Sequence, residues 1–251
     1  MHASQNTKTA QTTLRSPTVA RLLDRLFRAA EETDPAIFAR AQESRLAAGK
    51  SEREITNSDL DRFLGEAYMP VPREMGDLLY ILARAQRSRT IVEFGTSFAI
   101  STIHLAAAVR DNGGGRVITT ELNAQKVQRA RQNLEESGLG DLVEVREGDA
   151  LVTLRDLDLD LDLDSGGGID LLLLDGWKDL YLPVLRLLEP RLRPGALVIA
   201  DDLDIQPELH KPYLDYVRAP ESGYVSVELP LGDRIEVSLR TPAWQRETPP
   251  G

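Results

Sequence analysis

Cysteine is absent from this chain of 251 residues, and histidine occurs only three times. Without cysteine the chain can form no disulfide, zinc–thiolate site or iron–sulfur cluster, and it has no thiol nucleophile. Any metal ion must therefore be held by oxygen or imidazole ligands.

Positive charge and long apolar runs are also scarce. The chain has 30 Lys and Arg against 40 Asp and Glu, a net charge of −10, with no basic patch. This charge repels phosphate backbones and anionic lipid heads, so we expect no nucleic-acid or membrane partner. No stretch approaches the roughly 20 apolar residues of a membrane span, and the first residues lack the apolar core of a secretory signal. We therefore predict a soluble, cytoplasmic protein.

The hydrophobic content, 41% of 251 residues, is enough to bury the core of one domain with an extension. We predict a flexible tail at 1–15, an N-terminal helical segment at 16–70, a main domain at 71–240 and a second flexible tail at 241–251. The helical segment is expected to cover the sheet or to form an oligomer surface, and we expect a homodimer.

Capping residues, proline and glycine divide the N-terminal region into helices. Four helices are expected: one starting at Ser16-Pro17, one over 35–48 that Gly49 ends, one capped by Asn57 or Ser58, and one over 73–86. The first and last of these carry apolar residues at helical spacing.

From residue 90 onward, short apolar runs alternate with helix-length segments. The runs are TIVEF (90–94), RVITTE (116–121), LVEVR (142–146), IDLLLLD (169–175) and ALVIAD (196–201). Such runs are typical of parallel strands that helices cover on both faces. Two alternating strands within 223–240, joined by a short turn, predict an antiparallel hairpin at one edge. The expected fold is a Rossmann-like, doubly wound α/β fold whose seven-stranded sheet has five parallel strands plus this hairpin.

Polar residues follow the first three predicted strands, at the edge where ligands bind in doubly wound folds. Gly95 lies in a tight turn before a helix that begins near Ser101, which suits an anionic or polar group. Glu121 ends the second strand, where a carboxylate can accept hydrogen bonds from a ribose diol, and Asp149 after the third strand suits an adenine amino group. Each acid could equally be a helix cap. Only Gly95 matches the G-x-G-x-x-G fingerprint, which disfavours a nicotinamide dehydrogenase.

Five segments carry the most specific pattern of the chain: VEFGTSFAISTIHLA, VITTELN, EGDA, LLLLDGWKDLYLPVL and LRPGALVIADDL. Together they resemble the class I S-adenosylmethionine-dependent methyltransferases, and more narrowly the catechol and caffeoyl-CoA O-methyltransferase family. The resemblance covers about residues 68–240. Its most specific part is DGWKDLYLP, which is similar to the family's D-H-W-K-x-x-Y-L-P, and LPLGDRIEVSLR resembles the family's final hairpin.

The resemblance implies a role for each matching residue. Glu93, Gly95 and Ser101 would hold the methionine end of the cofactor S-adenosyl-L-methionine, and Glu121 would hold its ribose. Asp149, Asp175 and Trp177 would contact its adenine and methyl group. Met69 and Val71 would close over the bound cofactor. Asp175, Asp201 and Asp202 would be the protein ligands of one divalent cation. The implied catalytic residues are Lys178, as the general base, and Asp175.

Elementary electrostatics also favours a cation at the ends of the fourth and fifth predicted strands. Three carboxylates there would repel one another unless they share a cation, and an all-oxygen site suits Mg²⁺, with Ca²⁺ or Mn²⁺ as alternatives. A phenol that binds such a cation loses its proton more easily. The resulting oxyanion can then accept the sulfonium methyl group by in-line displacement.

Four positions depart from the family pattern, and one of them is Arg234, which occupies the place of the last glycine in the family's hairpin motif, so the hairpin turn is expected to differ. Ala99 stands where glycine is common and is expected to crowd the cofactor turn, Gly176 replaces the histidine of D-H-W-K, and Asp202 replaces asparagine. Two other features leave alternatives open. His210 is either a core residue or part of the acceptor pocket, and the Leu-Asp repeat at 156–164 is either an exposed loop or a calcium-binding repeat.

The sequence therefore predicts a divalent-metal-dependent O-methyltransferase that acts on a hydroxyl of a small catechol-like or polyketide-like acceptor. Two alternatives share the fold: a metal-independent small-molecule methyltransferase, and a catalytically silent protein that binds the cofactor and a partner. A nucleic-acid methyltransferase is disfavoured, because Asp-Gly-Trp-Lys follows the fourth strand where an Asn/Asp-Pro-Pro-aromatic motif would be needed.

Overall fold

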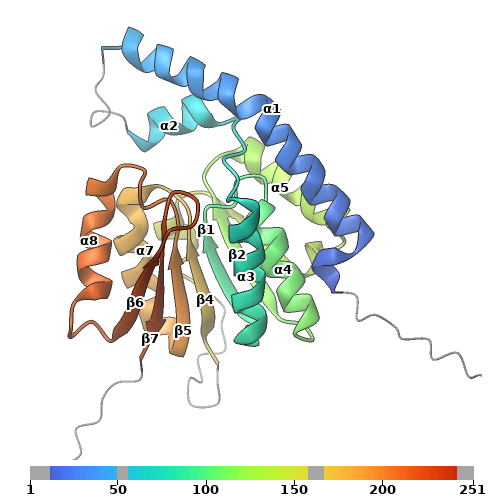
Figure 1. Cartoon of the computed structure of the whole chain (residues 1–251), viewed down its shortest axis with the longest axis vertical. Coiled ribbons are helices and arrows are strands. Elements are labelled where there is room, and N and C mark those ends of the chain that lie inside the picture. The colour runs from blue at the N-terminus through green and yellow to red at the C-terminus, as the bar shows by residue number, and fades with distance from the viewer. Residues whose placement is uncertain (1–11, 50–55, 158–166, 242–251) are drawn as a thin grey trace, which may run out of the picture.

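A seven-stranded sheet forms the centre of the computed structural model, which describes residues 12–49, 56–157 and 167–241 (Figure 1). The strands are β1 (Thr90–Phe94), β2 (Arg116–Glu121), β3 (Val143–Glu147), β4 (Ile169–Leu174), β5 (Leu192–Ala200), β6 (Tyr224–Leu229) and β7 (Ile235–Arg240). Their order across the sheet is β3-β2-β1-β4-β5-β7-β6. Strands β1 to β5 pair in parallel, and β7 pairs antiparallel with both β5 and β6. The predicted fold, five parallel strands with a C-terminal hairpin, is confirmed.

Helices cover both faces of the sheet, which is why the parallel strands read as unbroken apolar runs (Figure 1). On one face lie α3 (Arg73–Ala85), α4 (Ile100–Asp111) and α5 (Ala124–Ser137), and on the other lie α6 (Ala150–Thr153), α7 (Tyr181–Leu188) and α8 (Pro207–Arg218). Successive side chains of a strand point to opposite faces. In β4, Leu171 and Leu173 therefore join the core beneath α4, and Leu172 and Leu174 join the core beneath α7.

The longest helix, α1 (Pro17–Ala47), corrects the prediction of two helices separated at Pro35. Proline has no amide hydrogen to donate, so Pro35 removes one backbone hydrogen bond from the helix. Buried residues on both sides of it nevertheless keep α1 continuous: Val19, Leu22, Leu23, Leu26, Phe27, Ala30, Asp34 and Ile37. Although α1 has 31 residues, no helix within the described ranges is long and apolar enough to cross a membrane.

The chain before α1 is packed against the domain, which corrects part of the tail predicted at 1–15. Thr13–Arg15 form a 3-10 turn, η1, and the Thr13 amide donates to the Asp111 carboxylate at 3.0 Å. Residues 1–11, the tail after 241 and most of the Leu-Asp repeat lie outside the described residues. The other domain boundaries stay predictions.

A short helix, α2 (Asn57–Leu64), precedes α3. Its cap is Thr56, not Asn57 or Ser58, because the Thr56 side chain accepts from the Asp59 amide at 3.2 Å and the Asp59 carboxylate accepts from the Thr56 amide at 3.1 Å. This reciprocal pair is a capping box. The predicted helix over 73–86 corresponds to α3, and 3-10 turns complete the chain at η3 (Gly140–Leu142), η5 (Lys178–Leu180) and η6 (Glu189–Arg191).

Candidate functional site

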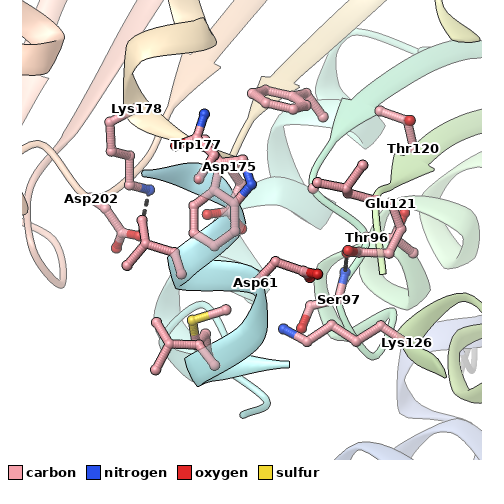
Figure 2. Close-up of a pocket in the computed structure, with 18 of the residues that line it drawn as sticks. Asp61, Thr96, Ser97, Thr120, Glu121, Lys126, Asp175, Trp177, Lys178 and Asp202 are labelled. Atoms are coloured by element: carbon pink, nitrogen blue, oxygen red, sulfur yellow. Dashed lines mark hydrogen bonds and ion pairs between the residues drawn. The ribbon is translucent and has the colours of Figure 1, made fainter. Parts of the chain in front are cut away.

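A cavity of about 920 Å³ opens at the carboxyl ends of the parallel strands (Figure 2). Its walls come from the turn after β1, the ends of β2 and β3, the loops after β4 and β5, and one side of α2. Strand order reverses between β1 and β4, and doubly wound sheets bind ligands at this reversal. A cavity of this volume is typical of small-molecule and cofactor sites.

Most of the site residues predicted from the sequence line this cavity. They are Met69, Val71, Gly95, Ser101, Glu121, Asp149, Asp175, Trp177, Lys178 and Asp202. Glu93 and Asp201 do not line it, since they are 0% and 1% exposed. The fold thus gathers the predicted residues at one place, while the role of each residue stays a prediction.

Glu93 lies behind the cavity wall, which corrects the expectation that it lines the methionine end. Its carboxylate accepts hydrogen bonds from the hydroxyls of Ser101, Thr102 and Thr119 at 2.7, 2.5 and 2.6 Å. Burial raises the pKa of Glu93 to about 7, although the three hydroxyl donors counteract it. Glu93 therefore positions Ser101 in the first turn of α4.

The turn after β1 uses backbone conformations that most residues avoid. Gly95 has φ +105°, and a Cβ there would overlap the Asp175 carbonyl, so the turn requires glycine at this position. Ala99 has φ 66°, a left-handed conformation that costs a non-glycine residue about 1–2 kcal/mol. Ala99 is fully buried and does not line the cavity, so the methyl group that we expected to crowd the cofactor turn lies outside the ligand space. Alanine in place of the family's glycine therefore adds backbone strain at this left-handed position.

Glu121 is held rigidly at the end of β2. Its Oε2 accepts from the Ser97 amide at 2.8 Å and its Oε1 from the Asn123 amide at 2.9 Å. Each carboxylate oxygen keeps further acceptor capacity that can face the cavity. Ser97, which the sequence analysis did not single out, therefore fixes the carboxylate that was predicted to hold a ribose.

Asp149 both caps a helix and lines the cavity. Its Oδ1 accepts from the Leu151 amide at 2.8 Å at the start of α6. The cap that we considered as an alternative is therefore present, and it places the carboxylate at the cavity wall. Trp177, just before η5, lies beside Asp175 (Figure 2).

Asp175, Asp201 and Asp202 meet at the ends of β4 and β5, because these strands are paired in parallel. Burial, and then the charges of Asp201 and Asp202, raise the pKa of Asp175 well above its ordinary value. Burial and the charge of Asp202 raise the pKa of Asp201 to about 7. Asp202 has φ 60°, a conformation that asparagine and aspartate tolerate better than most residues, so its departure from the family's asparagine leaves the backbone unchanged.

Oxygen donors of this kind suit a hard divalent cation, but Asp202 has another partner in this structure. The Lys178 amine donates to Asp202 Oδ2 at 2.8 Å (Figure 2). It also donates to the Tyr181 hydroxyl at 3.0 Å. Asp201 Oδ1 accepts from the Asp202 amide at 2.9 Å. Across the described ranges, no group of three or more acidic or histidine side chains is arranged to hold a metal ion. A cation would therefore have to replace the Lys178 ammonium beside Asp202.

Helix α2 spans the mouth of the cavity, a role that no sequence motif indicated. Asn57 donates to the Asp179 carboxylate at 3.2 Å in the loop after β4, and Asp61 accepts from the Asn123 side chain at 3.0 Å near the end of β2. The helix is thus attached on both sides of the cavity. Only its amphipathic spacing could have suggested that one face packs against the domain.

His210 does not reach the cavity. It is 0% exposed, its Nε2 lies 2.9 Å from the Ile205 carbonyl oxygen, and its ring centroid lies 5.2 Å from that of Tyr181. Of the two alternatives for this histidine, the core residue is correct.

Gly176 is explained by its neighbour Phe94. A Cβ at position 176 would overlap the Phe94 ring, which is 6% exposed and fills the space beside it. We expect Gly176→Ala to lower the free energy of unfolding by about 1–3 kcal/mol, the usual result of overpacking. In a Phe94→Leu background most of this loss should disappear, because the smaller side chain leaves room.

Urea unfolding of the wild type, both single variants and the double variant measures this coupling directly. An equal loss in both backgrounds would mean that Phe94 is not the reason for the glycine.

The comparisons with known proteins point to one family. A family described as a methyltransferase domain matches residues 92–203. A catechol O-methyltransferase of Niastella koreensis is 32% identical over 143 residues, which cover 56% of this chain and 62% of that protein. The match thus spans less than two thirds of the length of this relative.

A longer match is found in Danio rerio. Its catechol O-methyltransferase B is 31% identical over 208 residues, covering 81% of this chain and 74% of that protein. Among solved structures, an O-methyltransferase of Streptomyces achromogenes involved in tomaymycin synthesis, in complex with S-adenosylmethionine, superposes with a TM-score of 0.59. It is 26% identical, and the superposition covers 69% of this chain and 82% of that one.

Proposed function

The chain belongs to the catechol O-methyltransferase family of S-adenosylmethionine-dependent methyltransferases, and on this premise we propose that it methylates a hydroxyl group of a small acceptor. The observation that carries the proposal is Glu121. A carboxylate fixed by two backbone amides at the end of β2, and facing a cavity of about 920 Å³, is suited to bind a ribose diol.

The cofactor is proposed to lie along the strand ends from β1 to β3. Its ribose would bind to Glu121, its methionine end would approach Gly95 and Ser101, and its adenine would approach Asp149. Met69 and Val71 line the cavity just before α3 and would cover it. S-adenosylmethionine supplies the methyl group from its sulfonium, and these residues bind and orient it.

A divalent cation, Mg²⁺ above all, is proposed to bind to Asp175, Asp201 and Asp202. The support is electrostatic: burial and mutual repulsion raise the pKa of Asp175 and of Asp201, and a shared positive charge would relieve that repulsion. When bound, such a cation supplies charge that makes an acceptor hydroxyl more acidic. Asp202 would exchange its contact with Lys178 for the cation.

Lys178 is the proposed general base. Its side chain is 10% exposed, and its amine lies between Asp202 and the Tyr181 hydroxyl, at the cavity wall. Once released from Asp202, the ammonium would give a proton to solvent, and the neutral amine could then accept the proton of the acceptor hydroxyl at Nζ. Tyr181 is fully buried and its hydroxyl donates to the Asp201 carbonyl at 3.1 Å. This bond would hold the Tyr181 hydroxyl in place beside the Lys178 amine.

The acceptor is proposed to be a small, catechol-like or polyketide-like molecule. Leu60, Leu64 and Ile205 line the cavity with apolar side chains that suit the ring of an acceptor. Asp233 also lines the cavity and would repel an anionic acceptor.

Transfer of a labelled methyl group from S-adenosylmethionine tests the proposed function. A free catechol should be methylated in the presence of Mg²⁺, and chelator should abolish the reaction reversibly. Activity that persists in excess chelator would favour the metal-independent alternative. Cofactor binding without transfer to any of a panel of catechols, polyketide phenols and coenzyme A thioesters would favour the silent binding protein.

Replacing Glu121 with alanine should weaken S-adenosylmethionine binding by about 1.5–3 kcal/mol, the range for a hydrogen bond to a charged group. Calorimetric titration measures the change, and the fold should be retained because Glu121 is only partly buried. Glu135→Ala, an exposed position on α5, is the matched control and should bind as the wild type does. Unchanged affinity in Glu121→Ala would show that the ribose is held elsewhere.

A further inference from the structure

Lys126, in the first turn of α5, is a buried residue whose amine lies in the cavity wall. The residue is 5% exposed, and its amine lies 5.8 Å from the centroid of the Phe98 ring. Figure 2 shows the amine end of Lys126 pointing into the cavity, toward Asp61 and Ser97. No sequence motif marks this residue.

Within the described part of the chain, the Lys126 amine has no hydrogen bond or ion pair, although acidic residues surround it. Glu121 is its strongest charged neighbour, followed by Asp61, Asp34 and Asp175. Each of the first three already accepts protein donors: Glu121 from two backbone amides, Asp61 from Asn123, and Asp34 from the amides of Tyr68 and Met69.

Burial of an ammonium group without a hydrogen-bond partner is unfavourable. Accordingly, desolvation lowers the pKa of Lys126, against the attraction of the four carboxylates. A helix position that faced bulk solvent would avoid this penalty, so an amine held in the cavity wall indicates a partner that is supplied from the cavity.

We propose that Lys126 is a further cofactor-binding residue, which donates a hydrogen bond to the ribose hydroxyls whose protons Glu121 accepts. The inference rests on the proposed use of S-adenosylmethionine. A hydroxyl group has one proton to donate and lone pairs to accept. Glu121 provides the acceptor and Lys126 the donor, and the two side chains attract each other without being close enough to pair. A ribose diol between them would satisfy both.

The first experiment compares two ligands on the wild type, Lys126→Met and Lys126→Arg. The ligands are S-adenosylhomocysteine and its 2′,3′-dideoxy analogue, and calorimetry gives both affinities. Lys126→Met should bind S-adenosylhomocysteine about 10- to 100-fold more weakly than the wild type, the range for a hydrogen bond from a charged donor. It should bind the dideoxy analogue as the wild type does. Lys126→Arg should recover part of the lost affinity, because it keeps a charged donor.

The second measurement separates binding from a purely structural role. Methionine removes the buried charge at similar volume, so ligand-free Lys126→Met should unfold at the same temperature as the wild type or higher. A structural lysine would instead lower the unfolding temperature when it is replaced. Lys211→Met, which removes an exposed lysine on α8, is the control and should change neither affinity.

The outcomes distinguish this inference from the proposed function. If the wild type binds neither S-adenosylmethionine nor S-adenosylhomocysteine, both fail together. If the wild type binds them and Lys126→Met binds S-adenosylhomocysteine equally well, or loses affinity for both ligands alike, only the role of Lys126 at the ribose is overturned.

Discussion

Replacing Asp175 with asparagine should reduce methyl transfer below detection at saturating cofactor, acceptor and Mg²⁺. Asparagine keeps the size of the side chain but removes the negative charge that would hold a divalent cation between the ends of β4 and β5. The proposed cation supplies the charge that makes the acceptor hydroxyl more acidic, so its loss raises the activation barrier of methyl transfer. Turnover with labelled S-adenosylmethionine measures the effect, and chelator-treated wild type should behave in the same way until Mg²⁺ is restored.

Asp215→Asn is the matched control for this variant. Asp215 is exposed on α8, where it pairs with Lys211, and its replacement should leave turnover unchanged. Asp175→Asn that keeps its activity in excess chelator would contradict the proposed cation.

Binding of Mg²⁺ to the wild type gives a readout that does not depend on activity. The pKa of Asp201 is raised to about 7 and that of Asp175 well above its ordinary value, so part of the metal-free protein carries protons there at neutral pH. A cation must displace these protons. Calorimetry in two buffers of different ionisation enthalpy should therefore show proton release, and affinity should fall as the pH drops below 7.

Replacing Lys178 with methionine should lower turnover by about 10²–10⁴-fold, the usual contribution of a positioned general base. Affinity for S-adenosylmethionine should change little, because the amine pairs with Asp202 and lies away from Glu121 (Figure 2). Turnover and calorimetric affinity, measured on the same protein, separate the two effects.

Lys178→Arg distinguishes a base from a residue that only pairs with Asp202. Arginine keeps the positive charge but does not give up its proton in proteins. A base requires that Lys178→Arg be as slow as Lys178→Met, with the fall in turnover that protonation of the base causes at low pH lost in both. Recovery of activity in Lys178→Arg would show that the charge beside Asp202 is what matters.

Much of the site could be predicted because the strands themselves could be predicted. Apolar runs identify parallel strands, and the carboxyl ends of parallel strands meet at one edge of the sheet. Acids placed directly after such runs, among them Glu121, Asp149 and Asp175, therefore had to come close together, and they line one cavity. Family resemblance added Met69 and Val71, which precede the sheet in the chain and also line the cavity.

Helix ends and supporting contacts were harder to predict. Pro35 was taken as a boundary because proline disfavours a helix interior, but burial on both sides of it is the stronger effect. Family resemblance placed Glu93 at the methionine end of the cofactor, although its side chain points behind the cavity wall to three hydroxyls. Successive side chains of a strand point to opposite faces of the sheet, and the sequence near the end of a strand does not show which of them turns toward the cavity.

The sequence by itself thus determined the sheet, the hairpin at its edge and the strand ends at which polar residues gather, because these follow from local patterns of apolar and polar side chains. Only the tertiary structure decided how α2 spans the cavity, how Lys178 pairs with Asp202, and that the Lys126 amine lies at the cavity without a partner in the described chain. These contacts join residues that are far apart in the chain. Their geometry is fixed by how the helices pack on the sheet, which no local pattern of residues encodes.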